Sequence, residues 1–193
     1  IETADTDVVH VDMAIWGDDT RIDYYVDDSG HHHMDTDCSQ EGHRCSVNYT
    51  ITAPSNFDLD AHTGSGDVRA NGVNGNIRID TSSGDTEVRC STGQTLWIDT
   101  GSGDVRGTAL SFDTAELEAG SGDIHAAFGT VPLSVRAETG SGDVDIRVPT
   151  GAYDVRTDTG SGDVRVNGID RDDNAESSID VHTGSGDVNI SGR

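Results

Sequence analysis

One six-residue motif recurs along the chain and constrains the fold more than any other feature. It is clearest in Thr159–Val164, which reads Thr-Gly-Ser-Gly-Asp-Val, and six close or altered copies occur elsewhere. Successive copies place their aspartates 18 to 24 residues apart. A period near 20 residues is typical of a solenoid, in which each repeat forms one coil and stacks on its neighbours. The seven motif aspartates are Asp67, Asp85, Asp104, Asp123, Asp143, Asp163 and Asp187.

The residues around each motif alternate between apolar and polar. Before the turn, pairs such as Ile77/Ile79 share one parity, and after it pairs such as Val144/Ile146 do the same. A period of two places such pairs on one face of a strand, whereas no helical period of 3.6 appears. The sequence therefore predicts an all-β fold: a β-solenoid with two short strands per coil of about 20 residues and about seven coils over residues 51–193. The same alignment assigns Val88/Cys90 to the core, so Cys90 is expected to be a buried thiol.

The glycines and the aspartate of the motif have a predicted structural role. A chain that reverses direction within about four residues needs a positive φ, which glycine adopts without a Cβ clash. The aspartate is expected to accept hydrogen bonds from backbone N–H groups of its own turn. The motif is thus interpreted as the turn that closes each coil.

Residues 1–50 lack the repeat and form the first predicted unit. Strands are expected at 8–16, 21–26 and 45–52, with a polar loop from Asp27 to Arg44 between the last two. We interpret this unit as an antiparallel β segment that caps the first coil.

The charge of the chain excludes several functions. Thirty-six acidic residues against 12 basic ones give a formal net charge of −24. A nucleic-acid binder needs a basic face, and anionic lipid would repel such a chain. The self-repulsion would be relieved by salt, so a saline habitat is one explanation and arginine-favouring codons are another. No apolar run of about 18 residues is present, so no membrane-inserted helix is expected.

The segment Ile146–Val164 resembles the repeat of the adhesin-like β-solenoid family of bacteria and archaea, which is related to toast-rack domains of envelope proteins. The resemblance extends from about Val47 to the end of the chain. It implies an extracytoplasmic β-solenoid, secreted or at the cell surface. That family has no established catalytic residues, so the resemblance carries none over.

Stacking would bring the seven motif aspartates into one column, with about 4.8 Å between neighbours. Carboxylate oxygens suit calcium, so the column is a candidate metal site. A second acidic column is expected just before the motif threonines. The alternative is a solvated face partly neutralised by arginines, among them Arg78, Arg136 and Arg156 on one strand and Arg69, Arg106 and Arg165 on the other. The members of the second column are His62, Asp80, Asp99, Glu118, Glu138, Asp158 and His182.

The loop in the first 50 residues contains two cysteines. In an oxidising compartment Cys38 and Cys45 are expected to form a disulfide. The alternative is a zinc or copper site made of the two thiolates with His31, His32, His33 and His43, although the spacing matches no standard zinc motif. Asn48 and Asn189 begin Asn-X-Ser/Thr tripeptides and are candidate glycosylation sites.

Three functions follow from these patterns. The first is structural or adhesive work outside the cytoplasm. The chain begins at Ile1 rather than methionine, so it is expected to be processed or truncated, and it ends within the strand after the last motif. We expect the last coil to be left open there, either because the chain is truncated or because another chain covers it. Cover by the N-terminal β segment of a second copy would give a head-to-tail fibre. The second function is a cation- or ligand-binding module. An enzyme is disfavoured because no nucleophile and base come together in the pattern.

Overall fold

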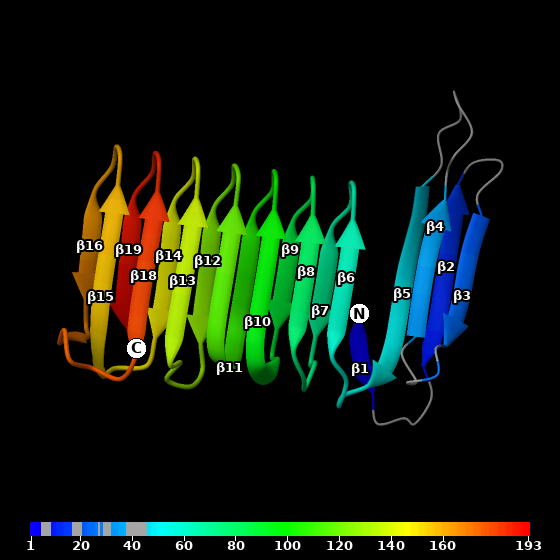
Figure 1. The fold of residues 1–193 in the computed structure, drawn as a ribbon, viewed down its shortest axis with the longest axis horizontal. Helices are drawn as coiled ribbons and strands as arrows, with labels where there is room; N and C mark the ends of the chain where they lie inside the picture. Colours follow the sequence, from blue (N-terminus) through cyan, green and yellow to red (C-terminus); the bar gives the residue numbers. More distant parts are fainter. Residues whose placement is uncertain (5–8, 17–20, 27, 29–31, 38–45) are drawn as a thin grey trace.

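In a computed structural model the chain forms a long two-layered β-solenoid with a small β unit at one end (Figure 1). The structure describes residues 1–193 except 5–8, 17–20, 27, 29–31 and 38–45. No helix in the described ranges is long and apolar enough to cross a membrane. The strands before the first motif are β1 (Glu2–Ala4), β2 (His10–Trp16), β3 (Arg21–Val26), β4 (His32–Asp37), β5 (Ser46–Pro54) and β6 (Leu59–Thr63). The next are β7 (Val68–Asn71), β8 (Ile77–Thr81), β9 (Thr86–Arg89), β10 (Thr92–Thr100), β11 (Val105–Ala119), β12 (Ile124–Phe128) and β13 (Ser134–Thr139). The last are β14 (Val144–Val148), β15 (Ala152–Thr159), β16 (Val164–Asn167), β17 (Asp170–Arg171), β18 (Ser178–Thr183) and β19 (Val188–Gly192).

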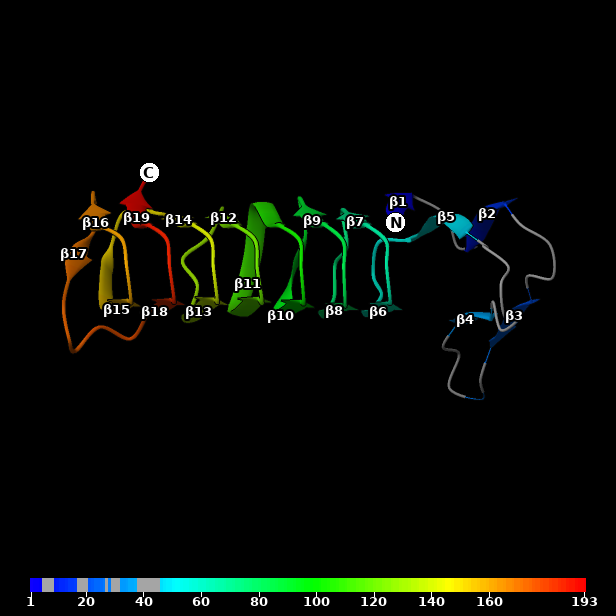
Figure 2. The same cartoon turned by 90° about the horizontal axis from the view of Figure 1, so that it is seen from above.

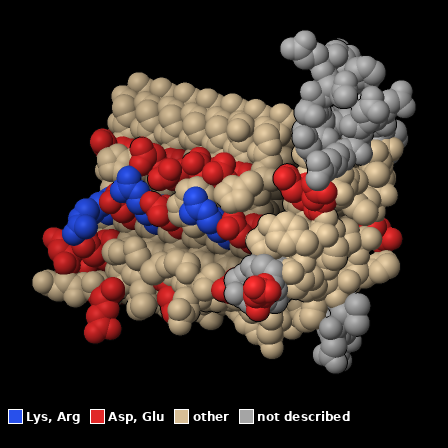
Figure 3. Space-filling view, turned by 45° about the vertical axis from the view of Figure 1, so that its right-hand side comes forward, with Lys and Arg blue, Asp and Glu red and all other residues tan. Residues whose placement is uncertain are grey.

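Each coil contributes one strand to each of two parallel stacks. The strand before the motif joins the front sheet, and the strand after it joins the back sheet. The front sheet is β6, β8, β10, the second half of β11, β13, β18 and β15, and the back sheet is β7, β9, the first half of β11, β12, β14, β19 and β16. Figure 2 shows the two sheets edge-on as two layers, and Figure 3 shows charged side chains running in rows along one outer face. The predicted all-β solenoid with two strands per coil is confirmed.

The last two coils do not stack in chain order. The strand β18 lies between β13 and β15, and β19 lies between β14 and β16. The chain therefore builds the terminal coil from β15 and β16 first. It then returns through residues 168–177 and inserts its final coil beneath it (Figure 1). The prediction that residues 188–193 form the open end is wrong, because β19 is paired on both sides.

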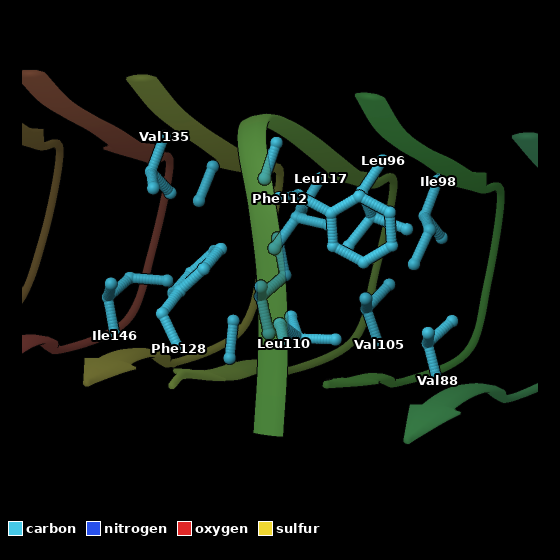
Figure 4. Packing of buried hydrophobic residues seen from close by; sticks show 14 of the residues in the cluster. Val88, Leu96, Ile98, Val105, Leu110, Phe112, Leu117, Phe128, Val135 and Ile146 are labelled. Atoms are coloured by element: carbon cyan, nitrogen blue, oxygen red, sulfur yellow. The ribbon is translucent and has the colours of Figure 1, made fainter. Parts of the chain in front are cut away.

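A narrow apolar core fills the space between the sheets. The inward columns predicted from the period of two are buried in the central coils: Ile79, Ile98, Ile146 and Val188 are all 0% exposed. Around β11 the core holds Phe112 and Phe128, which pack between the sheets with Leu96, Leu110 and Leu117 around them (Figure 4).

The predicted burial of Cys90 is wrong. Cys90 is exposed and has φ of +49°, and Ala109 in the next coil has φ of +54°. A residue in this left-handed conformation reverses the alternation of the strand, so Ser91 and Leu110 point inward instead. The inward pair of that coil is Thr86/Val88, two residues earlier than the expected Val88/Cys90, because Thr86 pairs with Val105.

The N-terminal unit has two layers of its own. One layer is the antiparallel pair of β5 and β2. Strand β1 pairs with both β5 and β7, and so connects this layer to the back sheet. The other layer is the β3–β4 hairpin. The strands expected at 8–16, 21–26 and 45–52 are observed as β2, β3 and β5, with β5 continuing to Pro54. The loop expected from Asp27 to Arg44 instead contains β4.

Candidate functional surface

The turn edge of the solenoid carries a chain of hydrogen bonds between coils. Six of the seven motif aspartates accept, at Oδ1, the backbone N–H of the aspartate in the adjacent coil at 2.8–3.1 Å. The bond was expected within each turn, but the structure places it between turns. Six such bonds link the seven aspartates, in the order Asp67, Asp85, Asp104, Asp123, Asp143, Asp187 and Asp163.

The other motif residues also connect one coil to the next. Four motif threonines donate their hydroxyl to a glycine carbonyl of the neighbouring turn at 3.0–3.2 Å. The second glycine donates its N–H to a serine carbonyl of the next turn, as Gly142 does to Ser185 at 2.9 Å. Threonine, glycine, serine and aspartate positions of the repeat thus all contribute hydrogen bonds between stacked coils. The motif therefore explains how one coil stacks on the next.

Arginines neutralise part of the aspartate column. The residue two positions after the motif aspartate is Arg69, Arg106 or Arg165 in three coils, and each pairs with its aspartate at 2.6–2.9 Å. Arg165 also lies 3.2 Å from Asp187. The backbone N–H of Asp163 and then the Arg165 guanidinium lower the pKa of Asp187 below its ordinary value. These arginines offset part of the charge of the column, as the predicted salt-bridged alternative requires, whereas no arginine pair is observed at Asp123 or Asp143 within the described residues.

Replacing Asp187 with asparagine tests this account. Asparagine keeps an acceptor oxygen but loses the charge that Arg165 and the Asp163 amide stabilise. Because the folded-state pKa of Asp187 is lowered, its stabilising effect is present above the unfolded pKa and is lost as pH falls through the folded pKa. We expect Asp187→Asn to melt below wild type at pH 7, and the difference to shrink as the pH falls through the folded-state pKa of Asp187. A melting-temperature difference that stays the same as the pH falls would contradict this.

The front sheet carries the second acidic column. Its observed order is His62, Asp80, Asp99, Glu118, Glu138, His182 and Asp158. The two histidines lie near carboxylates, His62 Nε2 at 2.9 Å from Asp60 and His182 Nδ1 at 3.6 Å from Asp158. Arg136 pairs with Glu138 at 2.7 Å, and Arg78 stacks over the ring of Trp97 at 3.7 Å. Arg136 therefore offsets Glu138, whereas the neighbours of Glu118 along the column, Asp99 and Glu138, are both acidic.

Glu118 is the strained position. Burial, and then the neighbouring charges of Glu116, Asp99 and Glu138, raise its pKa above the ordinary value. A carboxyl with a raised folded-state pKa favours folding at low pH and opposes it once ionised.

Glu118→Gln is therefore expected to stabilise the protein at pH 7 by roughly 0.5–1 kcal/mol, the size of a cross-strand charge pair. The gain should disappear near pH 3, where wild-type Glu118 is protonated. Thermal melts at the two pH values measure it. Asp113→Asn, at an exposed acid of β11 outside the column, is the control, and an equal gain from it would refute the assignment of strain to Glu118.

The other predicted sites remain predictions. Within the described residues no group of three or more His, Cys, Asp or Glu side chains is arranged to hold a metal ion, and Oδ1 of six motif aspartates is engaged by backbone. Cys38, Cys45, His31 and His43 lie outside the described residues. His32 bonds Tyr24 and His33 stacks on Tyr25. Asn48 is exposed on β5, whereas Asn189 is half-buried on β19 and donates to Asp145 at 3.1 Å.

A comparison with protein-family models matches residues 56–191 to the family described as Toastrack DUF4097. The match covers all seven motifs and ends within the last strand. No curated protein matches the chain. No solved structure matches it.

Proposed function

The chain belongs to the Toastrack DUF4097 family, and from this premise we propose that it is a structural module of the cell envelope, exposed outside the cytoplasm, with an adhesin-like role and the capacity to form fibres. The observation that carries the proposal is the motif itself. Its threonine, glycines, serine and aspartate all bond the neighbouring coil. The repeated part of the sequence is therefore used to build a stiff rod.

The outer faces suit display rather than catalysis. Two shallow depressions lie on them, one on the front sheet beside Trp97 and Arg78 and one on the back sheet beside Arg89, Arg106 and Arg147. Most of the charged groups around them are held in ion pairs, such as Arg89 with Glu87 and Arg147 with Asp145. A flat, salt-bridged surface of this kind fits a spacer or a contact surface.

The location is tested on intact cells of the organism that encodes the chain. An antibody raised against residues 56–191 should label unpermeabilised cells, and brief external protease treatment should remove the label. An antibody against a cytoplasmic protein is the control for cell integrity. Labelling that appears only after permeabilisation would overturn the proposal.

A calcium-binding role is the second candidate, and the acidic column at Asp99, Glu118 and Glu138 favours it, because its like charges raise the pKa of Glu118. A bound divalent cation would relieve that repulsion. Calcium should then raise the melting temperature of wild type more than that of Glu118→Gln. An equal response of both proteins, or none, would remove this candidate.

A further inference from the structure

One end of the solenoid stops with its backbone hydrogen bonds unfilled. In six coils the second motif glycine donates its N–H to the next coil, but Gly162, in the terminal coil, has no such acceptor among the described residues. The same holds for Val164, whereas its counterpart Val188 donates to Asp163 at 2.8 Å. On the edge of β15 that faces away from β18, β17 pairs only with Ala152 and Tyr153. Both β15 and β16 therefore present an open strand edge in the described structure.

Apolar side chains of the core are also exposed to solvent at this end. Val164 is 42% exposed, although the equivalent Val188 and Val144 in the coils beneath it are 0% and 1% exposed. Val166 is half-buried, whereas Ile190 beside it is 0% exposed. An open edge with apolar side chains is a template for another strand, and natural proteins ordinarily protect it.

The opposite end of the molecule has the same two-layered form. The strands β2 and β3 each pair on one side only in the described structure, β2 with β5 and β3 with β4. Figure 2 shows β2 and β3 outermost in their two layers. A hydrogen bond between the hydroxyls of Thr36 on β4 and Tyr49 on β5 joins the layers.

The space between these layers is apolar and incompletely closed. Met13 pairs with Tyr49 and so shares its inward face, and Tyr24 shares a face with Thr36 by the alternation of the hairpin. Met13 is 47%, Ile15 48%, Tyr24 51% and Val26 48% exposed. These are inward-facing side chains that remain half in solvent, and a further pair of strands would cover them.

We propose that a second copy of this chain covers this end, with its β16 pairing along β2 and its β15 along β3. The inference rests on the fibre-forming role proposed above and names its contact. Both ends offer two edges, one per layer, with apolar side chains between them, so one copy completes the other. The strand β2 runs antiparallel to β5, which is parallel to β1 and so to the back sheet. The β2–β16 pair is therefore antiparallel.

Such a contact joins two different surfaces and so repeats without closing, which produces a linear fibre. Backbone pairing of this kind is strand addition to an exposed edge, with alternate side chains providing the specificity. The net charge of −24 opposes association. Because salt screens repulsion between exposed charges, assembly should strengthen as salt rises.

The test uses one blocking variant at each end. Val164→Lys places a charge in the exposed core at the β16 end, and Ile15→Lys does so at the β2 end. Val131→Lys is the matched control, because Val131 is 53% exposed but lies in the connection between β12 and β13, away from both ends. Sedimentation velocity is measured over a range of concentrations at about 0.1 M and about 1 M salt, where the Debye length is roughly 10 Å and 3 Å. Circular dichroism melts check that each variant is folded.

Wild type and Val131→Lys are expected to sediment faster as concentration rises and to form filaments in electron micrographs. Each end variant should remain monomeric alone. An equimolar mixture of the two should form dimers, because each variant keeps one intact end and the two intact ends are complementary. Any of three results would overturn the proposed contact. Wild type could stay monomeric at both salt concentrations, the Val164→Lys protein could assemble like wild type, or the mixture could stay monomeric. Antibody labelling of cells tests the location of the protein independently of its assembly. If the protein is exposed on the cell but monomeric, the proposed contact is wrong and the proposed envelope location is not affected.

Discussion

Gly142→Ala is expected to destabilise the solenoid by about 3 kcal/mol or more, a cost reserved for severe overpacking. An alanine Cβ at this position would lie 2.1 Å from the carbonyl oxygen of Gly122 in the adjacent turn. That atom is backbone and belongs to a stack of turns that are hydrogen-bonded to one another, so it cannot move alone. The glycine φ of +152° adds strain for any side chain. Denaturant melts of the purified protein measure the loss.

The same motif position in the first coil supplies the matched control. Gly66 has only the Thr63 hydroxyl near a built Cβ, at 3.4 Å, and no preceding turn packs against it. Gly66→Ala should therefore cost less than about 1 kcal/mol, the ordinary range for a surface change. Gly66 is not among the glycines with a positive φ, so the difference between the two losses measures the close carbonyl contact and the backbone strain at Gly142 together. Equal losses for the two substitutions would contradict both causes.

This contrast shows which part of the motif was predictable from the sequence. Repetition and alternation revealed the two-stranded coil, because a period of two with buried β-branched residues has few other solutions. They also indicated a tight turn at the glycines. They did not show that Asp143 accepts from Asp187 rather than from its own turn, because spacing along the chain does not identify which backbone N–H lies closest after stacking.

Local backbone conformation limited the prediction in a second way. Cys90 and Ala109 adopt positive φ, which neither residue type favours, and this reverses the inward parity of the strand that follows. No residue pattern marks that reversal. Strand β4 was not predicted because His32–Asp37 contains few residues that favour strands. It forms a strand because its backbone pairs with that of β3, and residue type does not reveal such pairing.

The order of the last two coils was the largest error, and it had one visible signal. All coils carry similar inward columns and similar turns, so residue patterns show little preference for one neighbouring coil over another. Asp163 and Asp187 are, however, 24 residues apart, the longest separation between motifs. The extra residues lie in 168–177, the connection that returns past β15 to insert β18 beneath it. A longer connection is what such a return requires.

A pair of aspartate substitutions distinguishes the observed order from stacking in chain order. Ile190 and Val166 are direct neighbours in the back sheet and face the same core. Ile190 is 0% exposed because β14 and β16 flank its strand, whereas Val166 is half-buried at the terminal coil. Burying a carboxylate without a partner is severely unfavourable, so Ile190→Asp should cost about 4 kcal/mol or more. Val166→Asp should cost roughly 1–2 kcal/mol, because its carboxylate can reach water.

Stacking in chain order would reverse this result, since Ile190 would then lie at the open end and Val166 inside. Denaturant melts of both variants in dilute protein, where contacts between copies do not contribute, decide between the two arrangements. Cysteines placed at Ser134 and Ser178, whose hydroxyl oxygens lie 3.3 Å apart, provide an independent check. They should cross-link readily, whereas cysteines at Ser134 and Asp154, which are separated by β18, should not. A larger loss for Val166→Asp than for Ile190→Asp, together with cross-linking of the second pair, would show that the coils follow the order of the chain. The open end and its contact with a second copy would then have to be assigned to other residues.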